Sequence, residues 1–310
     1  MKKILGINIS HNCSFAFLKD GTLQEYYEEE RFNYIKDYMP EENNHGIYNY
    51  KYKALDYFKD ITFDMVIFAS YNRGHLQIEM PIVNHILTQV NHKDFSFYLD
   101  NHHIYHAICG LYFSKFNEAI ALISDGGGEN VYDKNFKVLQ SIYLINKHEA
   151  QNKYRYISNK QNDYFNHFPE IEQLKVLENI DTVFSSKLRA GLKYIHYLKK
   201  AGFNYGEEGQ LMGIAAYKNG KNNLDKEVLE IANTAQEETL NDVIELIEKA
   251  KTYSDCKNII LSGGYHLNCS NNFKLVKHFP KLNFFIDPIP YDGGTAVGAA
   301  FYYVQNYKRQ

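Results

Sequence analysis

Two histidines four residues apart, His102 and His106 in the segment HHIYHA, are the first candidates for chemistry. On a helix, side chains at this spacing project from one face, as two imidazole ligands of a single metal ion require. The residue after His102 is a histidine rather than the glutamate of the HExxH motif, which argues against a zinc-protease site. A cluster of solvated or core histidines is the competing interpretation of the pair.

Two aspartates stand immediately before glycines at predicted strand or loop ends, Asp125 in SDGGGE and Asp292 in YDGGTA. Their carboxylates could complete a ligand set of two histidines and two aspartates, which would suit Fe or Zn. Each aspartate alone is more often a turn or cap residue. Together with the two histidines, they predict a metal site.

Three glycine-rich turns could bring backbone N–H groups close to phosphate: Gly126-Gly127-Gly128, Gly263-Gly264 and Gly293-Gly294. Helix N-termini and exposed N–H groups bind anions for electrostatic reasons. One such turn would be weak evidence. Three in one chain, two of them beside candidate metal ligands, predict a metal–nucleotide site.

His11 and two basic residues are candidates for catalysis and substrate binding. His11 directly follows a predicted strand whose end would face a cleft, where it could act as a general base. A hydrogen-bonded loop histidine is the alternative. Arg31 and Lys36 lie just past another predicted strand and could neutralise an anionic substrate, or could belong to a solvated charged face.

The segment 186–200, SKLRAGLKYIHYLKK, reads as a basic amphipathic helix. Its cations could face an anionic acceptor, although a solvated helix face is the more frequent reading of such a pattern. The cations are Lys187, Arg189, Lys193, Lys199 and Lys200.

The elements that must position these residues form two similar halves. Each half begins with short apolar or β-branched runs typical of strands and continues into apolar spacing typical of helices. Because the candidate contacts fall at strand ends, the pattern predicts an α/β fold with two lobes around a cleft. The predicted lobes are residues 1–116 and 117–310, with a helical insertion at about 160–250. The predicted strands are 3–10, 13–18, 22–29, 64–69, 118–124, 258–262 and 283–288. Hairpin turns are predicted at Asp20-Gly21 and around Asp133-Lys134-Asn135. Helices are predicted at 50–59, 101–115 and 294–305.

Composition sets the remaining bounds. The chain has 310 residues, 45% hydrophobic and 23% charged, which excludes disordered and collagen-like classes. A net charge of -3 argues against a surface coated in positive charge for non-specific nucleic-acid binding. The four cysteines form no CxxC pair. The N-terminal apolar run is shorter than that typical of a signal peptide, and no apolar run approaches the roughly 18 residues of a membrane span. We therefore expect the protein in the cytoplasm, of a bacterium or of a host cell if the chain is viral.

Read together, these motifs resemble the O-carbamoyltransferase family of nodulation and antibiotic biosynthesis, which includes the tobramycin and cephamycin carbamoyltransferases. The resemblance runs nearly from end to end and in the family's order. Its segments are LGINISHNCSFAFLKDG, EEERF followed by Lys36, HHIYHA at 102–107, SDGGGE at 124–129, GEEGQLMGIAAY at 206–217, SGGYHLNCSNN at 262–272 and YDGGTAVGAA at 291–300.

The resemblance implies an actin/Hsp70-like (ASKHA) fold of duplicated RNase H-like units, as in the Kae1-type proteins of threonylcarbamoyl-tRNA synthesis. It implies that His11 is the catalytic histidine and that Lys36 contacts a carbamoyl-adenylate. The four candidate metal ligands match the family's iron ligands, and the glycines of 126–128 and 263–264, with Asn268, match its nucleotide contacts.

The implied activity is an ATP-dependent transfer of a carbamoyl group from carbamoyl-adenylate, made from carbamoyl phosphate and ATP, to an acceptor hydroxyl. Fe(II) or another divalent metal is the implied cofactor. The acceptor could be a small metabolite, a sugar or a hydroxymethylated pyrimidine, as nucleotide or in DNA. Between Arg31 and Lys36 this chain has FNYI, whereas the family tends to have basic residues there. This difference indicates a different acceptor.

Family members also carry a C-terminal domain similar to the YrdC fold, which makes the carbamoyl-adenylate. The present sequence ends after YDGGTAVGAAFYYVQNY and a few further residues, so we expect a separate YrdC-like activating protein as a partner.

Two other functions compete with carbamoyl transfer to a small hydroxyl. One is a Kae1-type tRNA threonylcarbamoyl transferase, but those proteins have the metal motif HxEGH where this chain has HHIYH. The other is a non-catalytic subunit that binds metal and nucleotide. The presence of His11, Lys36 and all four candidate ligands argues against such a loss of activity.

Overall fold

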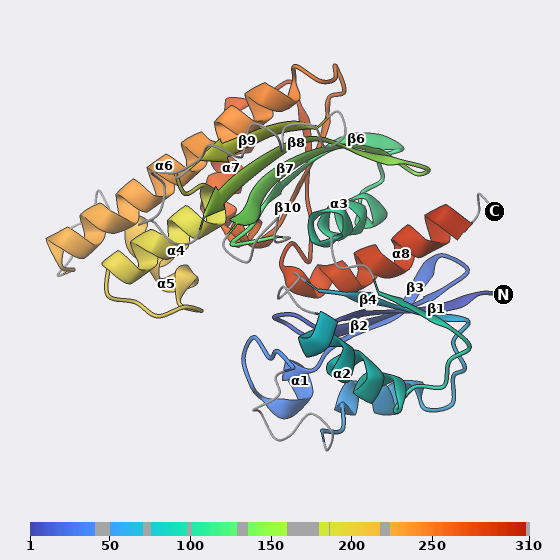
Figure 1. The fold of residues 1–310 in the computed structure, drawn as a ribbon. Helices are drawn as coiled ribbons and strands as arrows, with labels where there is room; N and C mark the ends of the chain where they lie inside the picture. The colour runs from blue at the N-terminus through green and yellow to red at the C-terminus, as the bar shows by residue number, and fades with distance from the viewer. Residues whose placement is uncertain are drawn as a thin grey trace.

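The computed structural model describes residues 1–40, 50–70, 76–97, 101–128, 136–159, 180–185, 187–217 and 224–307. Two mixed β-sheets with flanking helices form two lobes, as predicted, and helices α3 and α8 lie between the sheets (Figure 1). All four cysteines are free thiols. Within the described ranges, no helix combines the length and apolarity that crossing a membrane demands.

The first sheet has the order β3-β2-β1-β4-β5. Its first three strands form an antiparallel meander, and β4 and β5 add in parallel. The turn between β2 and β3 is the predicted Asp20-Gly21, and both residues have positive φ, as the tightest hairpin turns require. The strands are β1 (Lys3–Asn8), β2 (Ser14–Lys19), β3 (Thr22–Glu28), β4 (Met65–Ala69) and β5 (Phe95–Phe97), and the helical elements of this half are α1 (Glu30–Asn33), a 3-10 helix (Lys53–Phe58) and α2 (Leu76–Leu87).

The second sheet has the order β11-β10-β6-β7-β8-β9. Its antiparallel meander β6-β7-β8 and its parallel strands β10 and β11 repeat the pattern of the first sheet, and β9 adds in parallel at the far edge. The strands are β6 (Glu118–Ser124), β7 (Phe136–Asn146), β8 (Ala150–Asn159), β9 (Asp181–Ser185), β10 (Asn258–Ser262) and β11 (Asn283–Ile286).

The described part of the stretch 160–250, which was predicted to be mostly helical, contains three helices and one strand that the pattern did not indicate. The strand is β9, which extends the second sheet because its backbone pairs with the free edge of β8. Residues 160–179 and the predicted hairpin at 133–135 lie outside the described residues. The helices are α4 (Ala190–Lys200), α5 (Glu208–Ala215) and α6 (Lys226–Ala250), and α7 (Cys269–His278) follows β10.

Two helices cross between the lobes. Helix α3 (His102–Phe113) ends the first half of the sequence but packs on the second sheet, whereas α8 (Thr295–Tyr307) ends the second half and packs on the first sheet. Glycines allow these close approaches: a Cβ on Gly6 would lie 1.9 Å from the carbonyl oxygen of Ala296, and one on Gly298 would lie 1.9 Å from that of Tyr105. The lobe boundary at 116 and 117 stays a prediction, because each crossing helix contacts both lobes.

Candidate metal centre and adjoining cleft

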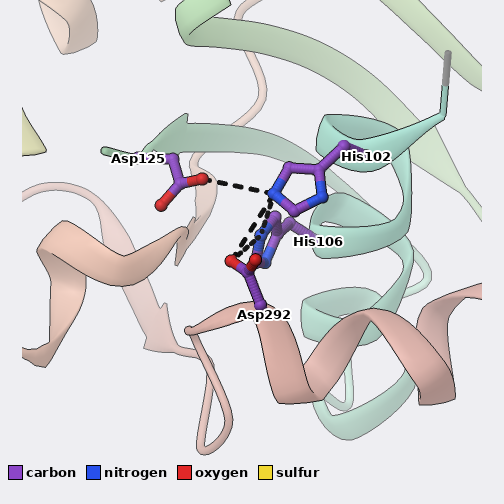
Figure 2. Close-up of side chains that lie close together, drawn as sticks. All are labelled: His102, His106, Asp125 and Asp292. Atoms are coloured by element: carbon purple, nitrogen blue, oxygen red, sulfur yellow. Dashed lines mark hydrogen bonds and ion pairs between the residues drawn. The ribbon is translucent and has the colours of Figure 1, made fainter. Parts of the chain in front are cut away.

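Four side chains that are distant in sequence meet between the two lobes. His102, His106, Asp125 and Asp292 each offer one ligand atom, and these atoms all lie within 4.8 Å of one another (Figure 2). Both histidines are fully buried, and Asp125 is 6% exposed. The structure therefore brings together the four residues that the sequence proposed as one metal site.

Three elements position this cluster. The histidines occupy the first two turns of α3, Asp125 directly follows β6, and Asp292 lies in the turn before α8. Because β6, β10 and β11 run parallel, their carboxyl ends share one edge of the second sheet. Ligand sites of open α/β sheets form at this edge.

The spacing of the cluster suits a single ion. His102 Nε2 lies 3.2 Å from Asp125 Oδ2, 3.2 Å from His106 Nε2 and 3.6 Å from Asp292 Oδ1. Ligand atoms about 2.1 Å from one metal, at angles near tetrahedral or octahedral values, lie roughly 3–3.5 Å apart. Two imidazoles and two carboxylates are a donor set for Fe(II) or Zn, so the residues fit a divalent transition metal.

A second set of groups orients the two carboxylates. The Ser10 hydroxyl shares its proton between Asp292 Oδ2 at 2.8 Å and Asn8 Oδ1 at 2.6 Å, and the Gly264 N–H donates to Asp125 Oδ1 at 3.1 Å. Asn8 Oδ1 in turn accepts the Ser10 N–H at 3.0 Å. Ser10 and Asn8 were not predicted from the sequence, although their place at the end of β1, beside His11, was a usable signal.

The electrostatics of the cluster favour a positive charge at its centre. Burial lowers the pKa of His102, but the neighbouring Asp292 and Asp125 outweigh burial and raise that pKa to about 10. Although burial opposes it, the hydrogen bond from His102 holds the pKa of Asp125 below its usual range, and the charge on His102 does the same for Asp292. A metal cation would take the place of the proton on His102.

A cavity of about 430 Å³ adjoins the cluster, and we call it the inner cavity. Asp125 and Asp292 line it, so the carboxylate side of the cluster faces this space. Among the other candidate residues, the inner cavity is lined by His11, Lys36, Gly126, Gly264 and Asn268.

His11 and Lys36 reach across the cleft to the loop between α4 and α5. The His11 ring lies 5.8 Å from the Tyr205 ring, centroid to centroid, and the Lys36 ammonium donates to the backbone oxygen of Gly206. Both residues belong to the first half of the chain, and the loop belongs to the second. Sequence reasoning missed Tyr205, which lies just before the segment GEEGQLMGIAAY that carried the resemblance.

The glycine-rich turns divide into two kinds. Gly126 and Gly264 line the inner cavity, whereas Gly127, Gly128 and Gly263 do not. A Cβ on Gly128 would lie 2.3 Å from His103 Nε2, and one on Gly263 would lie 2.3 Å from the carbonyl oxygen of Ser124. Close packing therefore explains the glycine at Gly128, and close packing together with a positive φ explains it at Gly263.

Asn268 lines the inner cavity, but its side chain is already engaged. Its Oδ1 accepts the Asn271 N–H at 3.1 Å and caps helix α7, and its Nδ2 donates to Gln236 Oε1 at 2.9 Å. Any contact of this side chain with a nucleotide would have to share these hydrogen bonds.

The remaining basic candidates lie apart from the inner cavity. Arg31 is 70% exposed and pairs with Glu28 at 3.2 Å. On the segment 186–200, Arg189 and Lys193 lie 3.2 and 2.9 Å from the same Asp242 oxygen of α6. Acidic side chains thus already neutralise part of this basic segment.

Comparison with protein families gives one match. Residues 173–301, which are less than half of the chain, match the family model described as carbamoyltransferase N-terminus. The matched region contains Gly263, Gly264, Asn268 and Asp292. This match supports carbamoyl transfer as the general function. No curated protein sequence matches the chain significantly.

Solved structures show the fold. A ROK family protein from Streptococcus pneumoniae in complex with sucrose matches 99% of this chain and 100% of its own, with a TM-score of 0.54 and 11% identity. Full-length HypF in a phosphate- and nucleotide-bound form matches 98% of this chain with a TM-score of 0.60 and 13% identity, and HypF from T. kodakarensis matches 99% with a TM-score of 0.60 and 14% identity. This chain spans 55% and 48% of those two HypF chains. The predicted actin/Hsp70-like two-lobed fold is therefore confirmed.

Proposed function

We propose that this protein transfers a carbamoyl group from carbamoyl-adenylate to the hydroxyl of an acceptor. The observation that carries the proposal is that Asp125 and Asp292 of the metal cluster line one cavity together with His11 and Lys36. The carbamoyltransferase match at residues 173–301 supports the reaction class.

His102, His106, Asp125 and Asp292 would hold the metal, for which we propose Fe(II). When bound, the ion would supply positive charge beside the phosphate and the reacting centre. Ser10 and Gly264 would keep the two carboxylates oriented toward it, as their hydrogen bonds already do.

The adenylate would occupy the inner cavity with its phosphate near Gly126 and Gly264. Two structural neighbours support nucleotide binding by this fold, since HypF was solved in a nucleotide-bound form and a ROK glucokinase from Streptomyces griseus was solved with glucose and AMPPNP. Because the Gly264 N–H already donates to Asp125, the backbone at Gly126, just past the carboxyl end of β6, would offer the donor to the phosphate.

His11 would take the proton of the acceptor hydroxyl as the oxygen attacks the carbamoyl carbon. A bond then forms between that oxygen and the carbonyl carbon, the bond from this carbon to the phosphate oxygen breaks, and AMP leaves with the bond's electron pair. Lys36 would stabilise the negative charge that develops on the carbonyl oxygen. Its ammonium has three donors, so it can keep the hydrogen bond to Gly206 while it does so.

The test compares the His11→Ala variant with the wild-type protein, with ATP, carbamoyl phosphate, Fe(II) and a separate YrdC-type protein supplying carbamoyl-adenylate. We expect His11→Ala to bind metal and nucleotide normally but to transfer about 10²–10⁴-fold more slowly, the usual contribution of a general base. His196→Ala, at an exposed position on α4, is the matched control and should transfer normally. Transfer by His11→Ala at the wild-type rate would contradict the assignment.

A further inference from the structure

A second cavity, of about 540 Å³, adjoins the inner cavity on the side away from the metal cluster, and we call it the outer groove. Five residues line both spaces and so form the wall between them: His11, Lys36, Asp37, Tyr205 and Gly206. The outer groove is further lined by Ile35, Tyr38, Met39, Asn204 and Glu207, and does not include the metal ligands.

The wall is built from both halves of the chain. Lys36 donates to the Gly206 oxygen, and Asn12 Nδ2 donates to Asp37 Oδ1 at 3.1 Å, which holds Asp37 beside His11. The side chain of Tyr205 is 56% exposed, although it belongs to this wall and its ring stands near that of His11. A molecule entering from the outer groove would therefore meet the Tyr205 ring and His11 together.

The charges that face the outer groove are mostly negative. Its described lining residues carry two carboxylates, on Asp37 and Glu207, and one ammonium, on Lys36, which already donates to a backbone oxygen. Glu207 Oε2 accepts the Asn204 N–H at 2.6 Å, so this carboxylate is held at the groove. Such a surface repels phosphate, whereas its oxygens can accept hydrogen bonds from hydroxyl or ammonium groups.

We propose that the outer groove is the acceptor subsite and that it selects a hydroxyl carried on an uncharged or cationic ring, which packs against Tyr205. The inference rests on the proposed function, because His11 in the shared wall is the group that would take the acceptor proton. It excludes acceptors that bring a phosphate into the groove.

The first experiment uses two acceptor probes that differ by one phosphate group, 5-hydroxymethyl-2′-deoxycytidine and its 5′-monophosphate. Binding is measured by calorimetry and transfer by mass spectrometry. We expect the nucleoside to have about a tenfold higher kcat/KM than the monophosphate, as charge repulsion in a solvated groove gives. Glu207→Lys should remove this preference. Glu149→Lys, which changes the net charge equally in the β7–β8 turn away from both cavities, should keep it.

The second experiment tests the ring contact. Tyr205→Phe keeps the ring and should leave the KM for the nucleoside within about twofold, whereas Tyr205→Leu should raise that KM about tenfold with a smaller effect on kcat. A merely structural role of Tyr205 would instead lower the stability of both variants and the amount of active protein without changing KM.

The outcomes separate this inference from the proposed function. If the monophosphate is bound and carbamoylated as well as the nucleoside or better, the acceptor subsite is wrong and the proposed function stands. If the nucleoside binds preferentially, with the expected response to Glu207→Lys, but neither probe is ever carbamoylated, charge selection by the groove is supported and the proposed function fails. If neither probe binds, the inference is overturned.

Discussion

Strand β1 is followed by Ser10 and His11, and the corresponding strand of the second half, β6, is followed by Asp125 and Gly126. The pairing registers define equivalent residues in the two halves, because β1 pairs with β4 in the same way as β6 pairs with β10. When the two five-residue strands β4 and β10 are aligned, Ser10 is the residue equivalent to Asp125. One half thus puts a hydroxyl where the other puts a carboxylate.

The crossing helices repeat this relation. Helix α3 follows the fifth strand of the first half and carries both histidines, and α8 follows the corresponding strand of the second half, directly after Asp292. The candidate metal centre therefore lies where equivalent elements of the two halves meet. The duplicated fold places equivalent strand ends and helices around one point, and the different residue types that the two halves carry there form the candidate metal ligands.

The halves differ most in the connection from β3 to β4 and in the corresponding connection from β8 to β10. The first half has α1 and one six-residue 3-10 helix in the described part of this connection, whereas the second half has β9 and helices α4, α5 and α6. The larger connection brings Tyr205 and Gly206 to His11 and Lys36. The first half therefore carries the candidate catalytic residues, and the second half closes the wall around them.

The largest expected effect is on metal affinity, when the two equivalent residues Asp125 and Ser10 are replaced one at a time. Asp125→Asn should lower the affinity for Fe(II) or Zn by at least about 100-fold, because it removes a charged candidate ligand. Ser10→Ala should lower it only about tenfold, because Ser10 acts through Asp292. Anaerobic calorimetric titration of the metal-free variants measures both affinities. Equal losses in the two variants would contradict the division of roles between the halves.

A smaller effect concerns pH and the second half. His266, in the turn Gly264–Leu267 beyond β10, is 2% exposed, and burial lowers its pKa to about 4. Its unfolded pKa is near 6.5, so only the unfolded state binds a proton between pH 6.5 and 4. This histidine should therefore make the free energy of unfolding fall with falling pH in that window, by at most about 1.4 kcal/mol per pH unit.

Urea unfolding at pH 7 and pH 5 checks the expectation. His266→Gln should lose less stability than the wild type between these two values. The matched control is His92→Gln at a half-buried position of the first half, which should keep the wild-type dependence. An unchanged dependence in His266→Gln would show that the buried histidine does not titrate as its environment requires.

The candidate metal centre could be predicted because each of its signals is local. Two histidines four apart on a helix share a face whatever surrounds them, and Asp125 and Asp292 stand before glycines at the ends of readable strands. That these signals meet was an expectation from fold class, since ends of parallel strands share an edge.

The wall of the outer groove could not be predicted, because its residues meet only through tertiary structure. Tyr205 and Gly206 reach His11 and Lys36 through the placement of α4 and α5. The glycine-rich turns were ambiguous for another reason. A glycine that allows an anion to approach the backbone cannot be distinguished in the sequence from one that is required by close packing, as Gly263 is against Ser124 and Gly128 against His103.

The most direct test of the central claim supplies carbamoyl-adenylate itself to the Fe(II)-loaded protein together with a hydroxyl acceptor. Mass spectrometry then follows AMP and the carbamoylated product. We expect both to appear in equal amounts, only when the acceptor is present, and to be lost in Asp292→Asn. Absence of product from the wild-type protein, or equal turnover by Asp292→Asn, would contradict carbamoyl transfer at this site.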